Sequence, residues 1–307
     1  MKILVTGGAG FIGSHVVEHF QGRAKVVVLD NLATGYRKNL AGLEHDFIEG
    51  SITDVDAVRS AMEGVDYVFH LAAMVSVPLS MERPKECVET NVLGLLNVLE
   101  QASQAGVRKL VHASSAAVYG DASEAPKDEG MLPDPRSPYA VSKLDGEYYL
   151  EMFRRDWGLA TASVRLFNVF GNRQDPDGAY AAAVPIFIKK ALSNEPLTIF
   201  GDGEQTRDFV HVTDVVRALE HLVTHPELHG AYNVGYGGSM TIAHLAREII
   251  RLSGSSSEIR HEAVRAGDVK CSEAVIDRLR STGFEPAGSL EKGLGLTLGQ
   301  MREDARD

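Results

Sequence analysis

Short apolar runs alternate with longer segments of helical periodicity through the first half of the chain. Runs rich in β-branched residues predict buried parallel strands at residues 3–5, 26–29, 47–48, 67–71, 110–111 and 164–167. Helices are predicted between them, notably at 84–105 and 139–157. In the first, Val88, Val92, Leu95, Leu96 and Leu99 fall at helical spacing and predict one apolar stripe.

Strand and helix repeated in this way predict an α/β fold of the Rossmann type, a doubly wound parallel sheet with right-handed crossovers. After residue 167 the alternation fails, and segments rich in Gly, Asp and Pro separate shorter elements. We therefore expect a second, smaller α/β domain. The expected domains are residues 1–167 and 168–307, with interleaved segments.

Composition narrows the possible partners. The chain has 307 residues, 44% of them hydrophobic, and a net charge of −11 with scattered basic residues, which gives no support to a nucleic-acid footprint. No run of about 18 apolar residues predicts a membrane span. Cys87 and Cys271 are too few for a disulfide framework, and residues 1–8 leave no room for a signal peptide, so a cytoplasmic protein is expected.

A glycine pattern follows the first strand, with Gly7, Gly10 and Gly13 spaced by three and opening a helix through Phe11 and Ile12. Glycines at these positions let backbone N–H groups approach a pyrophosphate at the positive end of the helix. Alone, the pattern also fits a glycine turn that binds nothing.

Asp30 makes the cofactor interpretation stronger. It ends the second strand, 17 residues after Gly13, where a carboxylate can accept hydrogen bonds from the adenosine ribose. A 2′-phosphate would be repelled there, and Arg37 lies too far along the chain to compensate, so the pattern predicts NAD. The alternative is an ordinary turn residue before Asn31.

Tyr139 and Lys143 form a candidate catalytic pair, because a spacing of four places both on one helix face. An ammonium group favours the phenolate and moves the phenol toward use as a base. A surface Tyr–Lys pair would be the plain interpretation. Against it stand Ser114 and Ser115, hydroxyls at the carboxyl end of a parallel strand, where ligands bind.

Together these motifs resemble the extended short-chain dehydrogenase/reductase family, particularly its nucleotide-sugar epimerases. The matching segments are residues 6–13, 30–32, 70–73, 91–94, 114–120, 139–143, 165–171 and 207–212. The resemblance implies that Ser115 and Tyr139 contact the sugar hydroxyl and that Lys143 lowers the pKa of Tyr139. Hydride then passes from sugar C4 to NAD⁺ and returns to the other face of a 4-keto sugar, so that NAD is retained.

The resemblance also implies two sets of binding residues. The NAD set is Gly7, Gly10, Phe11, Ile12, Gly13, Asp30, Asn31, Ile52, Asp54, Leu71, Ala72, Ala73, Asn91, Ser114, Tyr139 and Lys143. The substrate set is Ser76, Ser115, Asn168, Val184, Phe200, Arg207, Arg265 and Ser272. In it, Asn168 donates to a phosphate and the two arginines clamp the diphosphate of a UDP-sugar. Either arginine, taken singly, is also typical of a solvated surface.

Ala116 and Ala117 help to decide which reaction of the family is expected, epimerisation or the loss of water or carbon dioxide. Related dehydratases and decarboxylases carry a Glu or an Asp–Glu pair just after the serine, whereas methyl groups cannot move protons. Epimerisation needs no such group. The resemblance implies that the residue five positions after Gly267 lines the sugar pocket, and Ser272 is small there, so we expect the pocket to admit an N-acetyl group. Residues 178–185 resemble epimerases of N-acetylhexosamines or uronic acids.

The sequence thus predicts a 4-epimerase of UDP-glucose and UDP-galactose that also accepts N-acetylated or uronic acid UDP-sugars. An epimerase or reductase of another nucleotide sugar stays open, as does a non-catalytic NAD sensor, against which Ser115, Tyr139 and Lys143 argue. A homodimer is expected, although the apolar stripes of helices 84–105 and 139–157 could equally be core. His221, His225 and His229 recur every four residues, but Pro226 interrupts them, so no metal site is predicted.

Overall fold

The computed structural model describes residues 1–121, 126–178, 181–264 and 270–304. The chain divides into two compact units, and each takes segments from both halves of the sequence. Unit 1 comprises residues 1–120, 129–166 and 216–232, and unit 2 comprises residues 121–128, 167–215 and 233–307.

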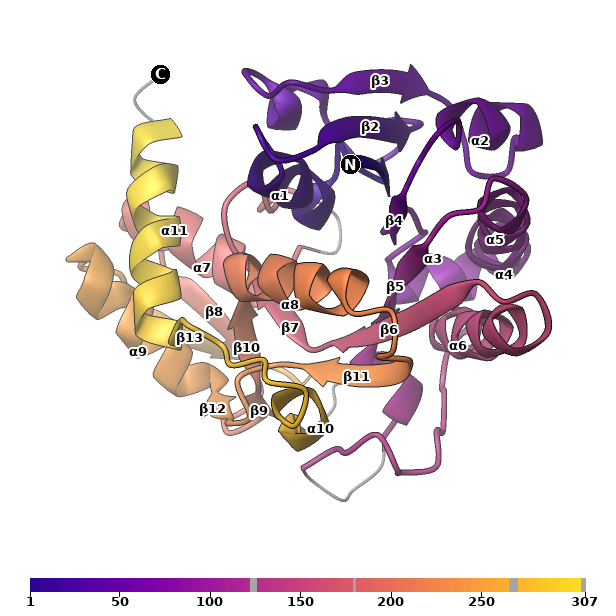
Figure 1. The fold of residues 1–307 in the computed structure, drawn as a ribbon. Coiled ribbons are helices and arrows are strands. Elements are labelled where there is room, and N and C mark those ends of the chain that lie inside the picture. Colours follow the sequence, from indigo (N-terminus) through magenta and orange to yellow (C-terminus); the bar gives the residue numbers. More distant parts are fainter. Residues whose placement is uncertain (122–125, 179–180, 265–269, 305–307) are drawn as a thin grey trace. The chain divides into compact units, whose positions relative to one another are not determined.

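A parallel sheet forms the centre of unit 1 (Figure 1). Its strands are β1 (Lys2–Thr6), β2 (Lys25–Asp30), β3 (Asp46–Glu49), β4 (Tyr67–His70), β5 (Lys109–Ser115) and β6 (Ala160–Leu166), with β11 (Gly230–Val234) beside β6. The order β3-β2-β1-β4-β5-β6, all paired in parallel, confirms the doubly wound fold. The central strands β1, β4 and β5 are buried along nearly their whole length, as expected where helices cover both faces of a parallel sheet.

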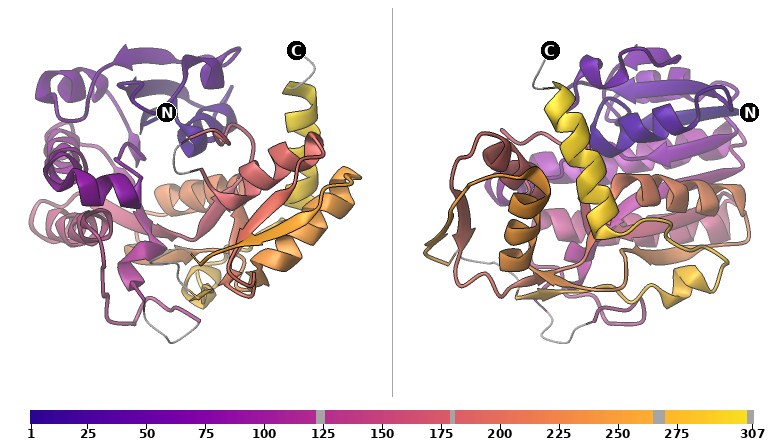
Figure 2. Two further views of the ribbon diagram at one scale, coloured as in Figure 1. Left: turned by 180° about the vertical axis from the view of Figure 1, so that it is seen from behind. Right: turned by 90° about the vertical axis from the view of Figure 1, so that its left-hand side faces the viewer.

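Helices lie on both faces of this sheet (Figures 1 and 2). They are α1 (Phe11–His19), α2 (Val55–Ala61), α3 (Val77–Glu82), α4 (Pro84–Val88), α5 (Gly94–Gln104), α6 (Pro138–Asp156) and the end of α8 (Val212–Thr224), with short turns η1 (Arg37–Leu40), η2 (Glu89–Leu93) and η3 (Ala116–Tyr119). The layer of α2, α5 and α6 covers one face, while α1 and residues 216–224 cover the other. A hydrogen bond between Nε2 of His19 and Oε2 of Glu220, at 2.6 Å, joins α1 to α8.

The predicted helix at 84–105 is a continuous helical run with a π-helical turn, η2, in its middle. The stripe prediction was wrong at Val88, which is 45% exposed, while Cys87 is fully buried in its place. A π turn holds one residue more than an α turn, so the face before it shifts by about one position. Val92, Leu95 and Leu99 are buried as predicted.

Unit 2 is a set of small sheets packed with three longer helices (Figure 2). Its elements are β7 (Asn168–Phe170), α7 (Ala183–Leu192), β8 (Leu197–Phe200), β9 (Thr206–Arg207), β10 (Phe209–His211), β12 (Met240–Thr241), α9 (Ile242–Ser253), β13 (Ile259–Glu262), β14 (Cys271–Ser272), α10 (Asp277–Arg280) and α11 (Leu290–Asp304). Apolar residues from α7, α9 and α11 share one core with β8 and β10. Within the described residues, no helix has the length and apolar character needed to cross a membrane.

Candidate active site

The glycine turn after β1 is too tight for side chains. Gly7 has φ +72°, and a Cβ there would lie 2.7 Å from the backbone nitrogen of Ala72. A Cβ on Gly13 would lie 2.1 Å from the carbonyl oxygen of Gly7. Helix α1 follows Gly10, which offers it no side-chain cap. The N–H groups of its first turn therefore face a cradle suited to the pyrophosphate of NAD.

Asp30 is fixed beside this turn. It is only 7% exposed, and its carboxylate accepts hydrogen bonds from the backbone N–H groups of Ala9 at 2.9 Å and Leu32 at 2.8 Å. The end of β2 and the glycine turn are thereby tied together. A carboxylate in this position can accept further hydrogen bonds from ribose hydroxyls, so the residues present fit NAD.

Three further predicted NAD residues, Asn91, Ile52 and Asp54, have structural contacts within unit 1. Asn91 binds the segment after β4, donating to the carbonyl oxygen of Met74 at 3.1 Å and accepting from its N–H at 2.7 Å. Ile52 is buried against Gly94. The carboxylate of Asp54 caps α2. Contacts of these three residues with NAD stay a prediction.

Ser115, Tyr139 and Lys143 all belong to unit 1. Ser115 is the last residue of β5, so the strand extends four residues beyond its predicted end and includes both serines. Helix α6 begins at Pro138 and is capped by the Ser137 hydroxyl, which puts Tyr139 in its first turn. The Nζ of Lys143 lies 5.7 Å from the centre of the Tyr139 ring.

The pKa of Tyr139 corrects a sequence-based expectation. Burial raises this pKa above its usual value, and a hydrogen bond with Ser115 acts in the opposite direction. Lys143 is 3% exposed, donates to the carbonyl oxygen of Ala113 at 2.8 Å, and has its pKa lowered by burial to about 8. Desolvation of the phenol thus outweighs the expected effect of the ammonium group.

His70 and His112 form a buried pair that the sequence did not reveal as part of the site. They are register partners on β4 and β5, and their rings stack 5.4 Å apart. Burial, with a smaller effect of Lys143, lowers the pKa of His70 to about 3 and that of His112 well below its usual value. Both rings are therefore neutral near pH 7 and add no positive charge beside Lys143.

A separate cavity of about 650 Å³ lies within unit 2. Four predicted substrate residues line it: Asn168, Val184, Phe200 and Arg207. Lys190, Gln205 and Glu262 line it as well and were not predicted. Gln205 stands two residues before Arg207, so the motif around that arginine was the available signal. Lys190 lies one helical turn after Phe187 on the same face of α7.

The polar groups of this cavity suit an anion. Helix α7 begins at Ala183 without a side-chain cap, and residues of its first turn line the cavity together with Arg207. An uncapped helix start and a guanidinium group both favour phosphate oxygens. The Nδ2 of Asn168 donates to the carbonyl oxygen of Asp208 at 3.0 Å, so one amide hydrogen has a partner inside the protein.

The remaining predicted substrate residues lie elsewhere. Ser272 pairs in register with Arg207 between β14 and β9, yet it is not among the described residues that line the cavity. Ser76, in unit 1, caps α3 by accepting from the N–H of Leu79 at 3.1 Å. Arg265 lies outside the described residues.

The histidine series at 221–229 is broken as Pro226 suggests, because α8 ends at Thr224. The rings of His221 and His225 lie 4.5 Å apart. In the part of the chain that the structure describes, no group of three or more His, Cys, Asp or Glu side chains is arranged to hold a metal ion.

Comparison with known proteins finds a matching family model, together with a sequence relative and solved structures that are nucleotide-sugar epimerases. The model of the NAD dependent epimerase/dehydratase family matches residues 3–235. A UDP-glucose 4-epimerase of Mycolicibacterium smegmatis is 37% identical over 314 residues, covering 100% of both chains. A solved UDP-N-acetylglucosamine 4-epimerase from Methanobrevibacter ruminantium, in complex with UDP-N-acetylmuramic acid, superposes with a TM-score of 0.95 at 36% identity, covering 99% and 98% of the two chains. A Thermus thermophilus UDP-glucose 4-epimerase in complex with NAD gives 0.90 at 39% identity, covering 98% and 99%.

Proposed function

The chain belongs to the NAD dependent epimerase/dehydratase family, and we propose on that premise that it inverts the C4 hydroxyl of UDP-sugars, interconverting UDP-glucose and UDP-galactose. It is an NAD-dependent isomerase. The observation that carries this function is the grouping of Ser115, Tyr139 and Lys143 in unit 1, the same unit that holds the glycine turn and Asp30.

Membership of the family by itself leaves both epimerisation and dehydration open. Ala116 and Ala117 favour epimerisation. They form the start of η3 directly after Ser115, whose hydroxyl accepts from the N–H of Ala117 at 3.1 Å. Neither methyl group can take or give a proton, so the elimination of water would lack its acid and base.

The chemistry of inversion needs one proton relay. When bound at the glycine turn and Asp30, NAD supplies the hydride acceptor and donor. Tyr139 removes the proton of the C4 hydroxyl and later returns it to the oxygen. Ser115 hydrogen-bonds to Tyr139 and favours its phenolate, which offsets part of the cost of burial. Lys143 holds positive charge beside the ring below about pH 8.

We further propose that the cavity of unit 2 binds the nucleotide part of the substrate. Asn168, Arg207 and Arg265 would bind the diphosphate, with the base near Phe200. A volume of about 650 Å³ is in the range of small-ligand sites.

N-acetylated and uronic acid UDP-sugars are proposed as further substrates because Ser272 is small and is the register partner of Arg207. Turnover of UDP-N-acetylglucosamine relative to UDP-glucose should fall at least about tenfold in Ser272→Tyr, since a bulky ring costs more than 1.4 kcal/mol against the larger sugar. An unchanged ratio would remove Ser272 as the gate.

The decisive experiment is incubation of the purified protein with UDP-galactose and no added NAD⁺. We expect UDP-glucose to form without NADH, because hydride is returned to the substrate and the cofactor stays bound. In a parallel incubation with added NAD⁺, steady accumulation of NADH would show a dehydrogenase, and a 4-keto-6-deoxy product in either incubation would show a dehydratase. Either outcome would contradict the proposal.

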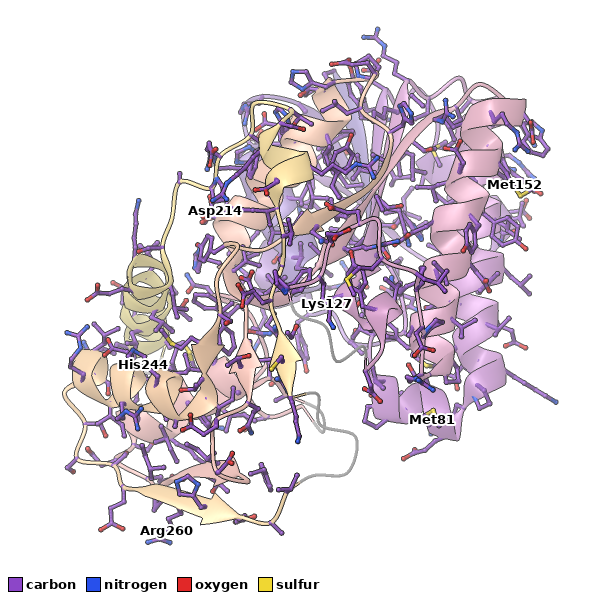
Figure 3. The ribbon with its side chains drawn as sticks, turned by 90° about the horizontal axis from the view of Figure 1, so that it is seen from below. Met81, Lys127, Met152, Asp214, His244 and Arg260 are labelled. Carbon is purple, nitrogen blue, oxygen red and sulfur yellow. The ribbon has the colours of Figure 1, made fainter. Side chains whose placement is uncertain are left out.

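A homodimer in the cytoplasm is proposed for the assembled protein. Apolar side chains are exposed on α6 at Val141, Tyr148 and Met152, which follow one helix face. Met81 in the neighbouring α3 is 60% exposed and lies on the same helical layer as Met152 (Figure 3). A second copy would cover this surface. Both cysteines are free thiols, which fits a reducing compartment.

A further inference from the structure

A buried ion pair connects β6 with α6, the helix that carries Tyr139 and Lys143. Arg165 on β6 and Glu147 on α6 have side chains that are only 6% and 9% exposed. The guanidinium group binds the carboxylate in a bidentate manner, with Nε–Oε1 at 2.9 Å and Nη2–Oε2 at 2.7 Å. This geometry fixes the direction of both side chains.

The pair is connected to the segment that carries Ser115. Ser114 donates to Oε1 of Glu147 at 2.5 Å, and it is the register partner of Arg165. Arg165 also donates through Nη1 to the hydroxyl of Tyr119 at 2.9 Å, and its guanidinium lies 4.9 Å from the centre of that ring. Tyr119 ends η3, the turn directly after Ser115. Both sides of Ser115 are thus held.

Glu147 belongs to the same helix as the catalytic residues Tyr139 and Lys143. Tyr139, Lys143 and Glu147 are spaced by four residues on α6, so they share one face. Ser114 and Ser115 are adjacent residues at the end of β5, so the contact of Ser114 with Glu147 fixes the strand end that carries the Ser115 hydroxyl. The position of Glu147 therefore sets how the Ser115 hydroxyl meets the Tyr139 phenol, which belongs to the same helix.

The cost of the arrangement also indicates a role other than stability. A buried ion pair is costly to desolvate, and apolar residues of similar size often stabilise a fold equally well. A fully hydrogen-bonded network does fix one geometry. This network joins the end of β5, which carries Ser115, to the turn η3 that follows it and to helix α6, which carries Tyr139 and Lys143.

We propose that Glu147 is a positioning residue, which acts through Ser114 and Arg165 to hold the Ser115 hydroxyl in hydrogen-bonding contact with Tyr139. The proposal rests on the proposed function. Glu147 touches neither the sugar nor the cofactor in this role, and its effect passes through Ser115.

The test is a double-mutant cycle between Glu147→Gln and Ser115→Ala. Glutamine keeps the shape and one acceptor oxygen but loses the charge that fixes Arg165. We expect kcat with UDP-galactose to fall about 10- to 100-fold, as for a small misplacement of reacting groups, while KM changes less than about threefold. In the Ser115→Ala background, Glu147→Gln should lower kcat by less than about threefold, because the group that it positions is gone.

Glu151→Gln is the matched control. Glu151 lies one turn further along α6 and forms an ion pair with Arg154 at 2.7 Å, but on the surface, with side chains 47% and 34% exposed. The same substitution there should leave kcat unchanged. If Glu147→Gln does not fold, Ser114→Ala removes one hydroxyl from the network and should show the same dependence on Ser115.

Two outcomes would overturn the proposal. One is an equal loss of kcat from Glu147→Gln with and without Ser115; the other is normal kcat in a Glu147→Gln protein that is merely less heat-stable.

A substrate-free readout separates this inference from the proposed function. It is ultraviolet titration of the Tyr139 phenol, measured as the difference from Tyr139→Phe. Glu147→Gln should raise the pKa of Tyr139 because the Ser115 hydrogen bond that lowers it is weakened. If the pKa of Tyr139 does not rise in Glu147→Gln, the proposal is contradicted, even if the wild-type protein turns over no UDP-sugar.

Discussion

Lys143 carries its charge at a cost to folding. Burial lowers its pKa from the usual 10.5 to about 8, so the folded state holds this proton less tightly than the unfolded chain. Below about pH 8 both states are charged and the folded state bears the full cost, roughly 3 kcal/mol for a shift of this size. Between about pH 8 and 10.5 the cost is relieved, so this group opposes folding less and less as pH rises.

Lys143→Met should therefore abolish most turnover and yet stabilise the fold. We expect the free energy of unfolding at pH 7 to rise by roughly 1–2 kcal/mol, less than the full cost because the carbonyl of Ala113 loses its donor. The gain should shrink between pH 8 and 10. Urea unfolding of both proteins at a series of pH values measures it; a variant less stable than wild type at pH 7 would contradict the assigned cost.

Tyr139→Phe tests the proton relay at the same scale. The ring and its burial are kept, so NAD should stay bound, but kcat should fall by about 10²- to 10⁴-fold because the acid–base group is lost. Tyr148→Phe is the control on the same helix, since that side chain is 60% exposed. Bound NAD is measured after denaturation and turnover with UDP-galactose. Near-normal turnover in Tyr139→Phe would remove this residue from the mechanism.

The glycine turn shows how an element can depend on missing side chains. A Cβ on Gly13 would lie 2.1 Å from the oxygen of Gly7, at the point where α1 meets β1. Neither partner can move easily, because both are backbone. The turn proposed to hold the pyrophosphate therefore leaves no room for a side chain at Gly13.

We expect Gly13→Ala to lower the free energy of unfolding by roughly 1–3 kcal/mol and to lose bound NAD, because the overlap forces the turn open. Gly295→Ala makes the same change on the exposed face of α11, where a Cβ would meet nothing within 4 Å. It should stabilise the protein by up to about 1 kcal/mol through helix propensity. Thermal unfolding and NAD content distinguish the two; equal effects would mean that crowding at Gly13 is unimportant.

At the scale of the whole molecule, the exposed apolar face of α6 predicts the state of assembly. Changing both Tyr148 and Met152 to Asp should convert a dimer into a monomer, because two charges per copy would be buried at the contact. Light scattering reads the mass. Leu132→Asp is the control, an apolar residue that is 89% exposed and belongs to neither α3 nor α6. A wild-type protein that is monomeric at micromolar concentration would contradict the proposed dimer.

The parts that sequence predicted well are those that depend on near neighbours in the chain. Apolar runs identified each strand of the parallel order β3-β2-β1-β4-β5-β6, although β5 extends further, to Ser115. The glycine pattern and Asp30 identified NAD, which the family model and the NAD complex of a relative support. Val88 was misplaced because a π turn leaves no mark in apolar periodicity.

The sequence by itself determined the fold class, the cofactor and the chemical groups at hand, because spacing along one strand or helix already places them on a common face or edge. Only the tertiary structure decided how those groups behave. The direction of the Tyr139 pKa follows from burial by distant segments, and the contact of Glu147 with Arg165 joins residues 18 apart in the chain. Desolvation and partner choice depend on which segments pack together, and local spacing does not encode that.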